Sequence, residues 1–101
     1  MRFTMLTLRP APGRVDDVIA YYRAAGILEA SGALSSQVLV PDDDPDTVVV
    51  TALWADQAAY TAWHNSAQRL EFSRGMAPFF GSADSAHTRE FQVGYGNAPA
   101  T

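Results

Sequence analysis

Four short hydrophobic runs and two longer segments with helical spacing divide the chain. The runs cover residues 2–9, 33–40, 47–54 and 86–95, and their lengths and β-branched and aromatic content are typical of strands. The first run, RFTMLTLR, has apolar residues on both faces, which predicts a strand covered on both sides. The PDDDPD segment at 41–46 predicts a turn, so we expect the second and third strands to form a hairpin.

Residues 14–29 have the spacing of an amphipathic helix. The apolar positions follow the i, i+3, i+4, i+7 rule. They are Val15, Val18, Ile19 and Tyr22. Gly26 weakens the last turns by about 1 kcal/mol relative to alanine. We expect Ser31 and Gly32 to end the helix, because glycine readily takes the positive φ found at helix C-termini.

A second helical segment follows the third strand. Asp56 can cap its N-terminus, because a carboxylate accepts hydrogen bonds from the free backbone N–H groups there. We expect a break near 65–66 and a continuation to Met76. The apolar stripe of this segment consists of Ala59, Tyr60, Trp63 and Ala67. With Trp54 at the end of the preceding strand, the stripe predicts an aromatic pocket wall.

The order of the elements is β-α-β-β-α-β, which predicts an α+β, ferredoxin-like fold. In this topology both helical segments cover one face of a four-stranded antiparallel sheet. We expect one domain over residues 1–96 and a flexible tail over 97–101. Because the other sheet face stays bare while 48% of the chain is hydrophobic, we expect a homodimer.

Composition and charge exclude several function classes. The net charge is −4, lysine is absent and the seven arginines are scattered, which argues against nucleic-acid binding. With no cysteine, disulfides and thiolate metal sites are impossible. The acidic turn lacks the spacing of a calcium loop, so we expect no metal. No stretch is long enough for a membrane span or a signal peptide, and we expect a cytoplasmic protein.

Three features resemble the antibiotic biosynthesis monooxygenase family of small dimeric α/β-barrel proteins. They are the Pro12–Gly13 step before the first helix, the hydrophobic third strand ending in Trp54, and the WADQAAY step into the second helix. The resemblance extends from the first strand through Tyr95. It implies a dimeric barrel, but its members differ widely in chemistry.

Within the family, the haem-degrading members match poorly. Their helical Trp corresponds to Trp63, but Phe72 or Ser73 stands where they carry a His ligand. Leu6 or Thr7 stands where they carry an Asn on the first strand. Haem binding or degradation is therefore the disfavoured alternative.

The cofactor-free anthrone oxygenases match better. Their pocket resembles Trp54, Tyr60 and Arg74, although Val50 replaces their Asn and a gap would shift the arginine role to Arg69. This resemblance implies a cofactor-independent monooxygenase that oxidises an aromatic or phenolic substrate with O₂ to a quinone. Trp54 would orient substrate, Tyr60 would hydrogen-bond or relay a proton, and Arg74 would stabilise an oxyanion.

Three further residues of the second helical segment are expected to contact substrate. They are Trp63, His64 and Phe72. Ordinary packing is a competing interpretation for Trp54 and Trp63, and solvent exposure for Arg74 and His87. Because no convincing general base is evident, a non-catalytic dimer that binds small molecules through the same pocket is the main alternative function.

Overall fold

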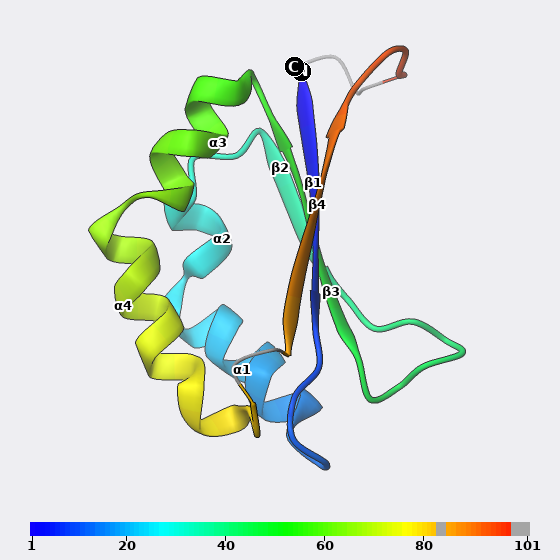
Figure 1. The fold of residues 1–101 in the computed structure, drawn as a ribbon, viewed down its shortest axis with the longest axis vertical. Coiled ribbons are helices and arrows are strands. Elements are labelled where there is room, and N and C mark those ends of the chain that lie inside the picture. Colours follow the sequence, from blue (N-terminus) through cyan, green and yellow to red (C-terminus); the bar gives the residue numbers. More distant parts are fainter. Residues whose placement is uncertain (83–84, 98–101) are drawn as a thin grey trace.

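The computed structural model describes residues 1–82 and 85–97 and contains a four-stranded antiparallel sheet in the order β2-β3-β1-β4. The strands are β1 (Arg2–Leu8), β2 (Ser35–Leu39), β3 (Val48–Trp54) and β4 (Ala86–Gln92). The helices are α1 (Val15–Ala25), α2 (Ile27–Ala30), α3 (Gln57–His64) and α4 (Ala67–Met76), followed by the short 3₁₀ helix η1 (Ala77–Phe79). The helices form one layer against one face of the sheet (Figure 1). The predicted α+β ferredoxin-like fold is confirmed.

The predicted hairpin of β2 and β3 is also confirmed. The two strands pair in continuous register from Ser35 opposite Leu53 to Leu39 opposite Val49. Asp44 orders the acidic turn between them, because its carboxylate accepts a 2.8 Å hydrogen bond from the Thr47 hydroxyl.

The first helical segment is shorter than predicted, because Gly26 divides it. Gly26 has a φ of 66°, in the left-handed region that glycine enters at little cost. Its N–H closes α1 on the carbonyls of Tyr22 and Arg23, and α2 begins at the next residue. The sequence prediction of one helix to residue 29 is therefore wrong: this glycine turns the chain rather than only weakening a helix.

The second helical segment has the predicted cap and the predicted break. The Asp56 carboxylate accepts a 2.8 Å hydrogen bond from the Ala59 N–H at the start of α3. After the break, the Ser66 hydroxyl accepts a 3.1 Å hydrogen bond from the Arg69 N–H and caps α4. Because α4 starts in a new direction, Ala67 is exposed and the apolar stripe of α3 ends at Trp63.

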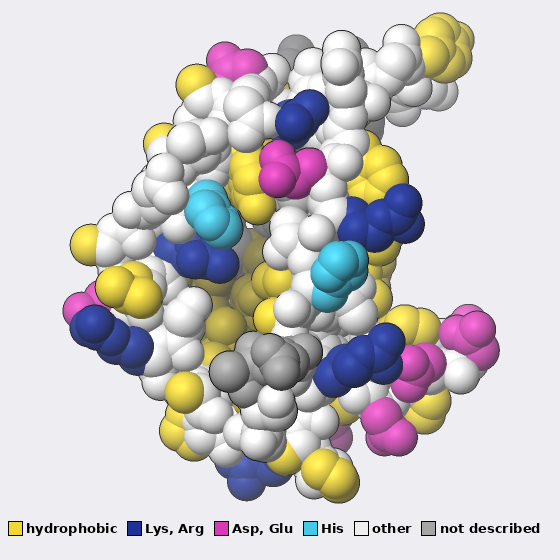
Figure 2. Space-filling model, viewed as in Figure 1, with side chains coloured by type: hydrophobic (Ala, Val, Ile, Leu, Met, Phe, Trp, Pro, Cys, Tyr) yellow, Lys and Arg dark blue, Asp and Glu magenta, His cyan; other side chains and the backbone are white. Residues whose placement is uncertain are grey.

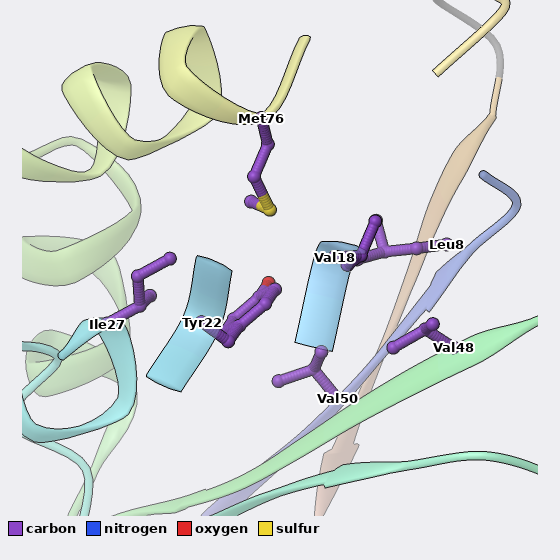
Figure 3. Close-up of a cluster of buried hydrophobic side chains, with 7 residues drawn as sticks. All are labelled: Leu8, Val18, Tyr22, Ile27, Val48, Val50 and Met76. Atoms are coloured by element: carbon purple, nitrogen blue, oxygen red, sulfur yellow. The ribbon is translucent and has the colours of Figure 1, made fainter. Parts of the chain in front are cut away.

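The main hydrophobic core lies between the helices and the sheet (Figure 3). Its buried members are Leu8, Val18, Tyr22, Ile27, Val48, Val50 and Met76. The opposite face of the sheet is bare in the single chain and carries partly exposed apolar side chains. These are Phe3, Met5, Val49, Leu53 and Phe91. β1 is therefore covered on one face only within this chain.

Two further expectations concern the tail of the chain and membrane-spanning segments. Of the predicted tail, residues 98–101 lie outside the described residues. Within the described part of the chain, no helix has the length and apolar character needed to cross a membrane.

Candidate functional site

A cavity of about 160 Å³ lies between the helical layer and the sheet. Figure 2 shows the hollow with hydrophobic side chains inside it and the two histidines of the chain on either side. All four strands of the sheet contribute side chains, and the helices contribute aromatic side chains from α1, α3 and α4. The sequence-predicted residues that line it are Trp54, Tyr60, Trp63, His64 and Phe72.

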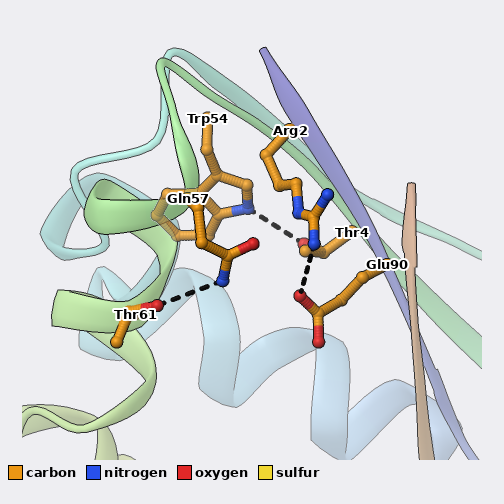
Figure 4. A network of polar contacts seen from close by, with 6 residues as sticks. All are labelled: Arg2, Thr4, Trp54, Gln57, Thr61 and Glu90. Atoms are coloured by element: carbon orange, nitrogen blue, oxygen red, sulfur yellow. Dashed lines mark hydrogen bonds and ion pairs between the residues drawn. The ribbon is translucent and has the colours of Figure 1, made fainter. Parts of the chain in front are cut away.

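Trp54 is fixed in the wall of this cavity by a hydrogen bond that the sequence did not reveal. Its side chain is 2% exposed, and its indole N–H donates to the Thr4 hydroxyl at 3.0 Å (Figure 4). Thr4 is buried on β1 and lines the same cavity. The indole donor is therefore already satisfied, and Trp54 presents its ring rather than its N–H to a ligand.

Tyr60 links the buried wall to the more exposed rim. Its ring centroid lies 5.4 Å from that of Trp54 and 5.7 Å from that of His64, one turn later on α3. Burial raises the pKa of the Tyr60 phenol; the charge of Glu90 adds to the rise, and Arg69 opposes it. The phenol therefore stays protonated near neutral pH and can donate a hydrogen bond.

Trp63 and Phe72 form a second aromatic pair on the helical side of the cavity. Their ring centroids are 6.1 Å apart, and each residue is half-buried. Because they come from α3 and α4, the pair depends on the break between the two helices at Asn65 and Ser66.

Arg69, not Arg74, faces the cavity. Arg69 lines it together with Phe72 and Ser73, three and four residues later on α4. Arg74 is exposed and lies outside the lining, because five residues along a helix turn a side chain about 140° away. Of the two arginines considered for this role from the sequence, the structure places Arg69 in the lining.

Tyr22 is the cavity residue that sequence reasoning missed most clearly. The helical pattern indicated a core position, and Tyr22 is indeed 5% exposed, yet it also lines the cavity. Burial raises the pKa of its phenol to about 12, while the nearby charge of Arg69 lowers it. Among the described residues its hydroxyl has no hydrogen-bond partner, and it is not among the fully buried atoms that lack one, so it is accessible from the cavity. The phenol of a tyrosine on an apolar stripe is the only sequence signal that could have suggested this role.

An ion pair lies beside the Trp54–Thr4 hydrogen bond. Arg2 Nη2 is 3.6 Å from Glu90 Oε1, and Glu90 is opposite Thr4 in the register of β1 and β4 (Figure 4). Both side chains are partly exposed, so the pair contributes little to stability. Glu90 nevertheless places a negative charge near Tyr60.

The cavity therefore combines aromatic walls with hydrogen-bond donors and a single cation. Arg69 is the one charged residue among the described residues of the lining, which include no carboxylate. His87 is exposed and outside the lining. The described residues contain no cluster of three or more His, Asp or Glu side chains that could hold a metal ion. Such a lining can pack against an aromatic ring and donate hydrogen bonds to an anionic group.

The fold and the cavity define a ferredoxin-like α+β domain with an aromatic, ligand-sized pocket beneath its helices. The sequence model of the antibiotic biosynthesis monooxygenase family matches residues 1–75. The chain therefore belongs to the antibiotic biosynthesis monooxygenase family.

Several solved structures share this fold. A Nitrosomonas europaea protein of unknown function has a TM-score of 0.80 at 20% identity, with 99% of this chain and 95% of that chain covered. A protein described as an antibiotic biosynthesis monooxygenase has a TM-score of 0.73 at 16% identity, with 92% and 98% covered. A Pseudomonas aeruginosa protein has a TM-score of 0.71 at 21% identity, with 91% and 92% covered. No curated protein matches the chain at a significant level. At these identities the structural likeness shows the fold alone.

Proposed function

We propose that this protein is a cofactor-independent monooxygenase that oxidises a phenolic or quinol-like aromatic substrate with O₂ to a quinone. The observation that carries the proposal is the position of Arg69, a cation in an aromatic cavity whose described lining includes no carboxylate. A fixed guanidinium in such a site stabilises a phenolate, the form of the substrate that transfers an electron to O₂. Membership of the family supports the reaction class.

For a phenol and O₂, the atoms and electrons of the proposed reaction balance in the following steps. The phenol loses its proton, the phenolate passes one electron to O₂, and the resulting radical and superoxide combine at a ring carbon bearing hydrogen. The peroxide takes up the proton. The ring carbon then loses its hydrogen as a proton while the O–O bond breaks, and the departing hydroxide combines with that proton to leave as water. One oxygen atom remains on carbon as the second quinone carbonyl, and the other leaves in the water. The protein needs to orient the ring, stabilise the anion and exclude bulk water.

The cavity residues supply these three functions in the proposal. Arg69 stabilises the phenolate, and the Tyr60 phenol donates a hydrogen bond to it or to the peroxide. His64, the imidazole in the lining, is the side chain best suited to accept the substrate proton near neutral pH. The rings of Trp54 and Trp63 hold the substrate ring in place.

The first test is O₂ uptake by purified, metal-free protein. Simple hydroquinones and phenols, naphthohydroquinones and anthrones are each compared with an autoxidation blank. We expect protein-dependent uptake of one O₂ per quinone formed for at least one compound. No uptake above the blank across the panel would reject oxygenase activity towards these compounds.

Variants of the active protein test the residue assignments. Arg69→Gln should lower kcat by about 100-fold or more, as removal of an oxyanion-stabilising donor does. Arg74→Gln is the matched comparison on the same helix and decides between the two arginines. Trp54→Phe and Tyr60→Phe should lower turnover while the fold, measured by circular dichroism, is retained. Wild-type rates in both of these variants would contradict the roles given to Trp54 and Tyr60.

A non-catalytic binding protein is the second candidate. It is favoured by the hydrogen bond between Trp54 and Thr4, which leaves the indole N–H unavailable to orient a substrate. Saturable binding of aromatic compounds with no O₂ uptake would select this function.

We further propose that the functional unit is a cytoplasmic homodimer. Partly exposed Phe3, Leu53 and Phe91 on the bare sheet face support the dimer, because a second copy would cover them.

A further inference from the structure

We propose that the cavity selects a one-ring aromatic oxyanion, a benzoate or a phenolate, whose charged oxygen lies between Arg69 and Tyr22. The inference that this selection serves substrate recognition rests on the proposed function. It narrows the substrate class from aromatic molecules in general to those with one ring and an anionic oxygen. The shared chemistry is a negatively charged oxygen attached directly, or through one carbon, to a single ring.

The size of the cavity limits the ligand to one ring. Its volume is about 160 Å³. An engineered apolar cavity of about 150 Å³ in another protein takes up benzene. The walls that set this volume include well-packed residues from both layers, such as Val50 in β3 and Met76 in α4, each 9% exposed. Because packed interiors do not expand freely, further fused rings would have to extend through the opening seen in Figure 2 or move the helices off the sheet.

The charge of the ligand follows from Arg69. No described carboxylate lies within 4.0 Å of its guanidinium, and its one described side-chain hydrogen bond is a 3.4 Å contact from Nη1 to the His64 carbonyl. At that length the bond is weak. A cation against an apolar wall without a counter-ion is therefore available to pair with an anionic ligand.

Tyr22 supplies a second donor beside this cation. Its phenol is neutral, has no described hydrogen-bond partner and is close enough to Arg69 for the two to interact electrostatically. Because the phenol and the guanidinium line the same cavity, both can donate to one oxygen anion bound there. Thr4 adds a further hydroxyl whose oxygen already accepts from Trp54, so that it too is available as a donor.

Equilibrium binding under anaerobic conditions tests this proposal. The probes are benzoate, its neutral isostere benzamide, 4-nitrophenolate, naphthoate and anthracene carboxylate. Binding is measured by isothermal titration calorimetry and by quenching of the two tryptophans, both of which line the cavity. We expect benzoate to bind about ten- to hundredfold more tightly than benzamide, as a charge-assisted hydrogen bond allows. Naphthoate and anthracene carboxylate should bind more weakly than benzoate.

Two variants and one control locate the anion. Arg69→Gln should remove the preference for benzoate over benzamide, and Tyr22→Phe should weaken benzoate by about two- to tenfold. Arg23→Gln changes the same charge at an exposed position of α1 outside the cavity, and benzoate binding should be unchanged. If Arg69→Gln does not fold, the benzoate and benzamide affinities of the natural protein decide the question alone.

The result that would overturn the proposal is specific to each of its parts. Equal affinities for benzoate and benzamide would exclude anion selection, and tighter binding of naphthoate would exclude the one-ring limit. The benzoate and 4-nitrophenolate arms show whether a carboxylate or a phenolate is preferred. These measurements exclude O₂, and benzoate is not a phenol. Selective binding of benzoate can therefore be observed even if the protein shows no O₂ uptake, and it can be absent even if O₂ uptake is found.

Discussion

At the scale of single residues, the hydrogen bond from Trp54 to Thr4 determines how the aromatic wall can act. A buried indole N–H without a partner is costly, and a threonine hydroxyl on the neighbouring strand satisfies it at 3.0 Å. The two residues are 50 positions apart in sequence, and the β1–β3 register places them on the same face of the sheet. Trp54, which is expected to orient substrate, therefore has a rigid ring rather than a free N–H available for this role.

Tyr22 makes a prediction about pH. Its pKa is about 12 in the folded protein and 10.0 without the burial, so the folded state retains a proton that the unfolded state loses. Below pH 10 both states are protonated and stability is unaffected, whereas above it stability falls as pH rises. The loss approaches roughly 3 kcal/mol near pH 12, and urea denaturation across this range measures it.

Two variants show whether this residue is responsible. Tyr22→Phe should reduce the loss of the free energy of unfolding above pH 10. Tyr95→Phe changes a side chain that is 96% exposed, and the loss should remain. An unchanged alkaline slope in Tyr22→Phe would assign the effect to other groups.

At the scale of elements, the cavity depends on how closely α4 approaches α1. Gly75 lies in the last turn of α4, where glycine is less favourable for the helix than alanine by up to about 1 kcal/mol. A Cβ at this position would lie 2.6 Å from Cζ of Tyr21 and would also overlap the hydroxyl of Tyr21. Glycine therefore lets Tyr21 of α1 pack closely against α4, the helix that carries Arg69.

Gly75→Ala should consequently destabilise the protein despite its better helix propensity. Overpacking costs about 1–3 kcal/mol, against a gain of about 1 kcal/mol in the helix. In a Tyr21→Ala background the obstruction is absent, and the same substitution should become stabilising. Urea denaturation of the four proteins measures both effects. A stabilising Gly75→Ala in the natural background would mean that Tyr21 moves aside without cost.

At the scale of the whole molecule, the bare face of the sheet predicts self-association. Leu53 lies on this face one residue before the end of the inner strand β3, opposite Phe3 in the register of β1 and β3, and both side chains are partly exposed. We expect light scattering to give twice the mass of the chain. Leu53→Glu should shift the protein to the monomer, because it places charges in the apolar interface.

The control for the dimer is another leucine on the surface. Leu70→Glu changes a side chain that is 50% exposed on α4, in the helical layer, and should remain dimeric. A natural protein that is monomeric at all concentrations would contradict the homodimer.

Much of the architecture follows from the sequence by itself. The strand and helix patterns, the cap at Asp56 and the turn at 41–46 depend on neighbours only a few residues away, so local periodicity and capping chemistry determined them. The aromatic members of the cavity were found in the same way, because Tyr60 and Trp63 share one face of α3.

Only the tertiary structure decided which polar groups reach the cavity. Arg69 rather than Arg74 faces it because the turn at Ser66 sets where α4 begins and how it is rotated. Thr4 and Tyr22 join the site because strand register and helix packing bring them together over long separations in the chain. A periodic pattern identifies a buried face, but the sequence could not show whether a phenol or hydroxyl on that face contacts packed protein or an open space.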